Sequence, residues 1–279
     1  MEYLMTSRGR LPLVGLGTFS IPPAVLEELI PFALQQGCTL FDTAYKYGNE
    51  AVLGNLLANV SEGETPLWVE TKICYEQVLG NLRYLCLNRR SVRSCMRLAA
   101  KKLRCDSLPV LMLHSTFSGD ERAFAALLQL KERGQIGLTG ICNVKIDDVE
   151  RLRHATGVYP DIVQCEIHPY HSNQELIRYC QSRGIIVEAR SPLAHGDALA
   201  EWAAEEVLRR LARKYGKSIV QIVLRWMVQQ QVVVLPRTSS LTHLKENLDL
   251  FDFGLTKEEM KEIDGLNRNQ SYGFFTKRR

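Results

Sequence analysis

The sequence has no long hydrophobic run. Apolar stretches such as residues 185–187 and 232–235 have at most the length of a strand, whereas a membrane-spanning helix needs ~20 apolar residues. The first ten residues are polar, so no signal peptide is expected. These absences predict a cytoplasmic protein with no membrane partner.

The chain also lacks a large excess of charge of either sign. The 35 basic and 31 acidic residues leave a net charge of +4, and residues 277–279 supply three of the positive charges. The body of the chain is therefore nearly neutral, and its charge does not call for a nucleic-acid partner. With 46% hydrophobic residues, the composition excludes disordered, collagenous and coiled-coil classes.

The sequence contains cysteines, but their spacing does not indicate a disulfide framework. None of the eight belongs to a C-x-x-C pair, and most lie inside apolar periodic segments. Scattered cysteines in a chain without a secretion signal are typical of reduced, buried thiols in a cytosolic protein. A disulfide-stabilised fold is therefore not expected.

Eight short β-type runs alternate with longer helical patterns along the chain. The runs are rich in Val, Ile, Leu and Thr without strict alternation, which is typical of parallel strands buried on both faces. They cover residues 13–17, 39–42, 67–72, 110–114, 136–141, 162–167, 185–189 and 232–235. No Pro/Gly/Ser-rich linker interrupts the pattern. We therefore predict the α/β fold of a (β/α)8 TIM barrel, as a single domain over residues 1–279.

The helical patterns also have predictable limits. They cover residues 24–36, 50–59, 91–103, 121–133, 147–154, 173–182, 202–215, 218–230 and 240–248. Thr256 followed by Glu259 predicts the capped start of one more helix. The long connection at 73–88 is apolar, and connections of this length are often functional. We expect it to be a substrate-facing flap, with packing on the barrel's own helices as the alternative.

Four polar residues at or near successive strand ends are the main candidates for chemistry. In a TIM barrel the active site lies at the carboxyl ends of the strands. Asp42 ends one predicted strand with Tyr47 just beyond it, Lys72 ends the next, and His114 ends the one after. Alone, a strand-end aspartate is often a helix cap and a histidine is often a structural hydrogen-bonding residue. The joint occurrence of all four favours a catalytic site.

These four residue types form one acid–base device. Tyrosine has a reference pKa of ~10 and is a poor proton donor near neutrality. A neighbouring ammonium favours the phenolate and lowers that pKa, while a carboxylate holds the ammonium in place. A neutral imidazole can donate a hydrogen bond that orients a carbonyl oxygen. The set predicts protonation of an oxygen while a hydride arrives at its carbon.

The segments that carry these residues resemble the aldo-keto reductase family. Residues 41–50 (FDTAYKYGNE) are similar to the family's first signature almost letter for letter. The resemblance covers nearly the whole chain and implies a TIM barrel that reduces aldehydes and ketones with NADPH. The other matching segments are 15–19 (GLGTF), 70–72 (ETK), 111–114 (LMLH), 140–144 (GICNV), 164–170 (QCEIHPY), 191–193 (SPL) and 235–238 (LPRT), followed by Glu246 and Asn247.

The resemblance implies a role for each matching residue. Tyr47 would be the proton donor, Lys72 and Asp42 would tune its pKa, and His114 would orient the carbonyl. Asn143 and Gln164 would hydrogen-bond the nicotinamide carboxamide. The other implied cofactor-binding residues are Gly17, Thr18, Asp42, Cys142, Arg190, Ser191 and Leu193, with Arg237, Thr238, His243, Glu246 and Asn247 at the adenosine end.

Three substitutions depart from the family pattern. Cys142 replaces a serine, and a thiol is a weaker hydrogen-bonding group. Arg190 stands where the family usually has an aromatic ring stacked on the nicotinamide. His243 stands where an arginine usually holds the 2′-phosphate, so we expect NADPH to be preferred over NADH by a narrower margin.

Two other enzyme classes fit the sequence less well. A Rossmann dehydrogenase would use Gly15-x-Gly17 and Asp42, but Ser20 occupies the third glycine position and the count of eight βα units does not fit. A metal-dependent hydrolase would need more than the strand-end histidines and cysteines, because no H-x-H pair lies on the first strand and no acid ends the last. No metal is therefore expected.

One alternative within the same fold is a catalytically weak, cofactor-binding regulatory subunit. The intact set of Asp42, Tyr47, Lys72 and His114 favours the enzyme. The expected partner is a small-molecule carbonyl substrate, and the chain is expected to be a monomer or a weak homo-oligomer.

Overall fold

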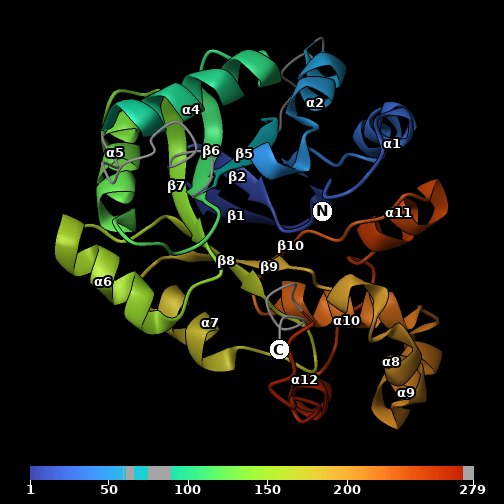
Figure 1. The fold of residues 1–279 in the computed structure, drawn as a ribbon. Coiled ribbons are helices and arrows are strands. Elements are labelled where there is room, and N and C mark those ends of the chain that lie inside the picture. The colour runs from blue at the N-terminus through green and yellow to red at the C-terminus, as the bar shows by residue number, and fades with distance from the viewer. Residues whose placement is uncertain (59, 61–65, 75–88, 273–279) are drawn as a thin grey trace.

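Eight parallel strands curl into a barrel with helices around them (Figure 1). The computed structural model describes residues 1–58, 60, 66–74 and 89–272. Each strand pairs with the next along the chain. The strands are β3 (Leu16–Gly17), β4 (Leu40–Asp42), β5 (Trp68–Ile73), β6 (Leu108–Leu113), β7 (Ile136–Cys142), β8 (Ile162–Glu166), β9 (Ile186–Arg190) and β10 (Val233–Val234).

Main-chain hydrogen bonds between the first and last strands close the barrel. Gly15 N donates to Val234 O at 2.9 Å, and Val234 N donates to Leu13 O at 2.9 Å. These bonds lie just before β3, in the segment where the sequence predicts the first strand. The predicted (β/α)8 barrel is confirmed.

The helices follow the predicted pattern with one exception. They are α1 (Pro23–Gln35), α2 (Glu50–Leu57), α4 (Arg89–Leu103), α5 (Asp120–Glu132), α6 (Ile146–Thr156), α7 (Gln174–Gln181), α8 (Leu199–Ala204), α9 (Glu206–Tyr215), α10 (Ile219–Gln229), α11 (Leu241–Leu248) and α12 (Lys257–Asp264). Helix α12 begins as predicted, because Thr256 and Glu259 form a capping box.

The single helix predicted over 202–215 is wrong. Helices α8 and α9 are separate, and the backbone of Glu205 between them is extended. Trp202 on α8 and Leu208 on α9 are both fully buried. On one continuous helix these two positions would point about 120° apart. The break turns both toward the core.

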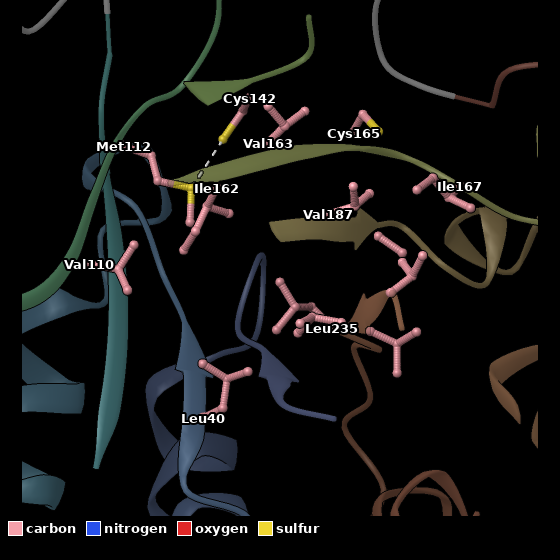
Figure 2. Packing of buried hydrophobic residues seen from close by; sticks show 14 of the residues in the cluster. Leu40, Val110, Met112, Cys142, Ile162, Val163, Cys165, Ile167, Val187 and Leu235 are labelled. Atoms are coloured by element: carbon pink, nitrogen blue, oxygen red, sulfur yellow. Dashed lines mark hydrogen bonds between the residues drawn. The ribbon is translucent and has the colours of Figure 1, made fainter. Parts of the chain in front are cut away.

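The strand interiors form the core of the barrel. Strands β5 and β6 are buried along their whole length. Figure 2 shows the side chains that pack there, with the thiol of Cys142 pointing at the sulfur of Met112, 3.7 Å away. Burial raises the pKa of several core thiols, including Cys38 and Cys142. All cysteines of the described ranges are free, as predicted; Cys86 lies outside them.

A short antiparallel hairpin precedes the barrel and has no counterpart in the predictions. It consists of β1 (Tyr3–Thr6) and β2 (Gly9–Pro12), and Leu11 at its end is fully buried. The hairpin leads directly into the start of the first barrel strand, so it lies at the end opposite the carboxyl ends of the strands. Within the described ranges, no helix is long and apolar enough to cross a membrane. Residues 75–88 of the predicted flap lie outside the described residues.

Candidate active site

A cavity of about 570 Å³ opens at the carboxyl ends of the strands. It runs from the predicted catalytic residues to helix α11 and brings together most of the predicted site. The predicted residues that line it are Gly17, Asp42, Tyr47, His114, Asn143, Gln164, Arg190, Ser191, Leu193, Arg237, Thr238, His243, Glu246 and Asn247.

Lys72 and Asp42 form a buried ion pair beneath this cavity. Strands β4 and β5 are neighbours, so the two side chains meet inside the barrel. The ammonium also donates to the carbonyl oxygen of Thr43 at 3.0 Å. Burial alone would lower the pKa of Lys72, but the Asp42 carboxylate outweighs it and raises that pKa above the usual value. Lys72 therefore remains a cation.

Tyr47 lies on a short 3₁₀ turn, η1 (Tyr45–Tyr47), that follows β4. Gly48 ends the turn in the left-handed conformation, with φ 72°. The Tyr47 ring packs edge-on against Phe19 and His114, with centroids 5.0 and 5.8 Å away. The Lys72 ammonium lies 5.2 Å from the centre of the ring. The predicted donor, its cation and the imidazole are thus in contact.

The expected direction of the Tyr47 pKa is wrong for the protein without cofactor. The Lys72 ammonium does favour the phenolate, as predicted. Burial of the phenol acts in the opposite direction and is the larger effect, so the pKa of Tyr47 is raised above its usual value. Tyr47 therefore keeps its proton at neutral pH, as a proton donor must.

His114 follows β6 and is a neutral imidazole. Its burial, together with the positive charges of Lys72, Lys46 and Arg190, lowers the pKa of His114 to about 3. The thiol of Cys74 lies 3.6 Å from Nδ1. A thiol that donates to Nδ1 leaves the imidazole proton on Nε2. His114 is thus suited to donate a hydrogen bond without adding charge.

Two amide side chains on β7 and β8 border the cavity beside the catalytic residues. Asn143 adopts a left-handed conformation, with φ 57°, and its Nδ2 donates to the His114 carbonyl oxygen at 2.9 Å. Gln164 Nε2 donates to Asp42 Oδ1 and to Glu188 Oε2, both at 3.1 Å. The amide nitrogens are engaged with the protein, so the acceptors for a ligand are Asn143 Oδ1 and Gln164 Oε1, the second of which also accepts from the Cys142 thiol at 3.7 Å.

Arg190 reaches the cavity from the end of β9. Its guanidinium donates to Glu166 Oε2 at 3.2 Å, and the same carboxylate group accepts hydrogen bonds from Ser271 Oγ and Tyr272 N, each at 2.6 Å. Burial opposes ionisation of Glu166, but its hydrogen bonds and Arg190 outweigh burial and lower its pKa to about 2. The arginine is therefore held in place by a permanently charged partner.

The far end of the cavity is formed by the start of helix α11. Ser240 caps the helix by accepting a hydrogen bond from His243 N at 3.3 Å. Thr238 Oγ1 accepts from Ser240 N at 3.0 Å, which fixes the turn. Arg237 is exposed, and within the described ranges it forms no ion pair. Together with His243, it offers positive or hydrogen-bonding groups to an anion.

Three predicted residues do not line the cavity. Thr18 is fully buried, and its hydroxyl donates to the Asp42 carbonyl oxygen at 2.8 Å. Cys142 is also fully buried, with its thiol 3.7 Å from Gln164 Oε1. Lys72 is fully buried beneath the cavity, paired with Asp42 and close to the Tyr47 ring. Thr18 and Cys142 therefore support the cavity wall rather than face a ligand.

The structure also adds residues that the sequence did not indicate. His195 lines the cavity, and its Nε2 lies 2.9 Å from Ser191 Oγ. Both residues have positive φ, 57° and 50°. This strained turn has no glycine at either position, so no sequence signal indicated it. Phe19, beside Tyr47, is the other aromatic residue that the predictions left without a role.

Within the described ranges, no cluster of three or more His, Cys, Asp or Glu side chains is arranged to hold a metal ion.

The chain is similar over most of its length to known proteins. The Aldo/keto reductase family model matches residues 13–268. The chain is 33% identical to the uncharacterized oxidoreductase YtbE of Bacillus subtilis, over 94% of this chain and 91% of that protein. It is 31% identical to methylglyoxal reductase DkgA of Escherichia coli O157:H7, over 94% and 92%.

A solved structure shows the same similarity. A mutant of Gox0644 in complex with NADPH superposes with a TM-score of 0.83 at 26% identity, over 96% of this chain and 93% of that one. The family match spans the barrel and every residue of the cavity. The chain belongs to the aldo/keto reductase family.

Proposed function

We propose that this reductase, which uses NADPH to reduce carbonyl groups, does so with Tyr47 as the proton donor. The observation that carries the proposal is the contact of Tyr47 with both Lys72 and His114 at one end of the cavity. A phenol that retains its proton, an ammonium and a neutral imidazole are the groups that protonation of a carbonyl oxygen requires.

Each residue then has one task. Bound NADPH supplies the hydride. The neutral His114 donates a hydrogen bond that orients the carbonyl oxygen toward Tyr47, and the Tyr47 hydroxyl transfers its proton to that oxygen. Lys72, held by Asp42, stabilises the phenolate that remains. Asn143 is positioned by its hydrogen bond to the His114 backbone, so it would hold the nicotinamide next to the imidazole that orients the carbonyl substrate.

The acceptor atoms and positive groups of the cavity fit the cofactor. Asn143 Oδ1 and Gln164 Oε1 are acceptors suited to the carboxamide N–H groups of a nicotinamide. At the other end, Arg237 and Thr238 precede a helix N-terminus, which favours negative charge. These residues would hold the adenosine 2′-phosphate together with His243, while Glu246 and Asn247 would hold the adenosine. Arg190, Ser191 and Leu193 would lie along the cofactor between the two ends.

The remaining assignments follow from this proposal. The complete catalytic set favours the enzyme over a regulatory subunit that only binds cofactor. We place the protein in the cytoplasm, as a monomer or weak homo-oligomer whose partner is a small-molecule carbonyl compound. A screen of aldehydes and ketones with NADPH and with NADH tests the activity directly. Loss of reduced-cofactor absorbance with at least one carbonyl compound is expected, and no turnover over a broad panel contradicts it.

We expect His243→Arg to tighten NADPH binding roughly tenfold and to leave NADH binding unchanged. A histidine makes fewer hydrogen bonds than the charged fork of an arginine, and one charge-assisted bond contributes ~1.5–3 kcal/mol, less at an exposed site. The measurement is the dissociation constant of each reduced cofactor by fluorescence titration. Lys245→Arg is the matched control on the same helix, because Lys245 does not line the cavity. An unchanged NADPH/NADH ratio shows that position 243 does not face the phosphate.

A further inference from the structure

Two glutamates lie inside the barrel beneath the catalytic residues, and the mechanism above does not use them. Glu70 on β5 and Glu188 on β9 are both 0% exposed. Glu70 is paired in register with Asp42, and Glu188 with Gln164. Side chains at these levels of a TIM barrel are usually Val, Ile or Leu. A pair of carboxyl groups here therefore needs a physical explanation.

The surroundings do not allow both groups to be ionised. Within the described ranges no donor reaches either oxygen of Glu70 or Oε1 of Glu188, and only Oε2 of Glu188 accepts a bond, from Gln164. Two bare carboxylates in contact inside a protein repel each other and lose their hydration. At least one of the two therefore keeps its proton, and burial beside Glu188 favours Glu70 as that one, because it raises the pKa of Glu70 well above its usual value.

The pair is connected to the catalytic residues through a single side chain. Gln164 Nε2 bridges Glu188 Oε2 and Asp42 Oδ1, at 3.1 Å each, and Asp42 holds Lys72. Glu70 and Lys72 are also two residues apart on β5, so both side chains point into the barrel. Because these side chains are buried, any change in the charge of the pair alters the electrostatic potential at Lys72 and Tyr47 with little screening.

We propose that Glu70 and Glu188 share a proton as an acid pair and act as positioning residues for the reaction, with the charge of the pair controlling how readily Tyr47 gives up its proton. The inference rests on the proposed role of Tyr47. A neutral pair adds no anion that competes with the Tyr47 phenolate for Lys72. A pair with one negative charge competes for Lys72 and opposes formation of a further anion near Asp42.

The charges around the pair determine the direction of its pH dependence. Asp42 faces it from β4 and Lys72 from β5, the thiol of Cys142 lies toward it on β7, and Gln164 on β8 is neutral. Burial raises the pKa of Glu70 well above its usual value and that of Glu188 to about 7. Raised acid pKa values mean that the pair is neutral below about pH 7 and carries one negative charge above it. Proton donation is therefore faster on the acid side.

Two isosteric substitutions separate the two charge states. In Glu188→Gln, the protonated Glu70 donates to an amide oxygen, so the pair is permanently neutral. In Glu70→Gln, the new amide donates to Glu188, which then ionises at lower pH and stays negative. The two variants are matched controls for each other, because each removes one carboxyl group and conserves shape.

Infrared spectroscopy of the protein without cofactor tests the proton directly. A protonated carboxyl has a C=O stretching band that a carboxylate lacks. We expect the wild type to lose about one such group per chain between about pH 6 and 8, and to retain another. Glu188→Gln should lack this transition, and Glu70→Gln should shift it to lower pH. Absence of any titrating protonated carboxyl in the wild type overturns the proposal, even if neither variant folds.

Single-turnover reduction with NADPH tests the consequence for the reaction. In the wild type, the rate should rise roughly 3- to 10-fold from about pH 8 to 6. Glu188→Gln should hold the fast rate, and Glu70→Gln the slow rate, across this range. If both variants slow the reaction equally, the pair is only structural. If Tyr47→Phe remains active, the proposed donor is wrong, but the infrared result still decides whether the pair shares a proton.

Discussion

Replacement of Tyr47 by phenylalanine should slow carbonyl reduction by ~10²–10⁴-fold, the usual effect of losing a general acid. NADPH affinity should change little, because the ring and its contacts with Phe19 and His114 remain. Single-turnover rates and cofactor titrations measure the two effects separately. Tyr45→Phe is the matched control, since Tyr45 lies on the same turn but is exposed.

A Tyr47→Phe enzyme with near wild-type rates would remove Tyr47 from the mechanism. If Tyr45→Phe lost as much activity, the effect would come from the turn η1 and not from the phenol. Retained NADPH affinity in both variants separates a chemical defect from a misfolded cavity.

Lys72→Met should slow carbonyl reduction by a factor similar to that of Tyr47→Phe. It should also lower the free energy of unfolding by about 3–5 kcal/mol. The variant leaves the Asp42 carboxylate buried without its cation, and breaking a buried ion pair has an effect of this size. Denaturant unfolding measures the stability, and single-turnover kinetics measure the reaction. The high pKa of Lys72 implies that the wild-type pair is intact throughout the neutral range.

The double variant Lys72→Met/Asp42→Asn separates stability from catalysis. It removes the uncompensated charge, so most of the lost free energy of unfolding should return while activity does not. Recovery of activity along with stability would mean that Lys72 only supports the fold. An unchanged stability in the single variant would mean that the ion pair is open to water.

The sequence was sufficient for most of the barrel because parallel strands carry a clear apolar pattern. The same pattern located Asp42, Lys72 and His114, since strand ends converge at one face of a barrel. It could not show which side chains face the cavity: Thr18 and Cys142 lie beside cavity residues in the sequence but point inward. Nor could it show the balance of burial and charge at Tyr47, which depends on depth inside the fold.

The sequence patterns could not predict contacts between side chains on opposite sides of the barrel, for a different reason. Glu70 and Glu188 belong to strands that are not neighbours in the sheet, so only the tilt and curvature of the closed barrel bring them together. The sequence patterns also could not predict the break between α8 and α9. The residues of each helix fit a helical period, but one continuous helix through Glu205 could not turn the apolar side chains of both segments toward the core.

The hydrogen bonds that join residues 13–15 to Val234 have a consequence for how the protein is made. They connect positions about 220 residues apart, so a ribosome must deliver the chain through Val234 before they can form. Until then the first strand is an unpaired edge, which is prone to aggregation. The ligand cavity includes Gly17 from one side of this junction and Arg237 from the other. A ligand that contacts both sides of this junction therefore binds the closed barrel and stabilises it over chains in which the junction is open, by mass action.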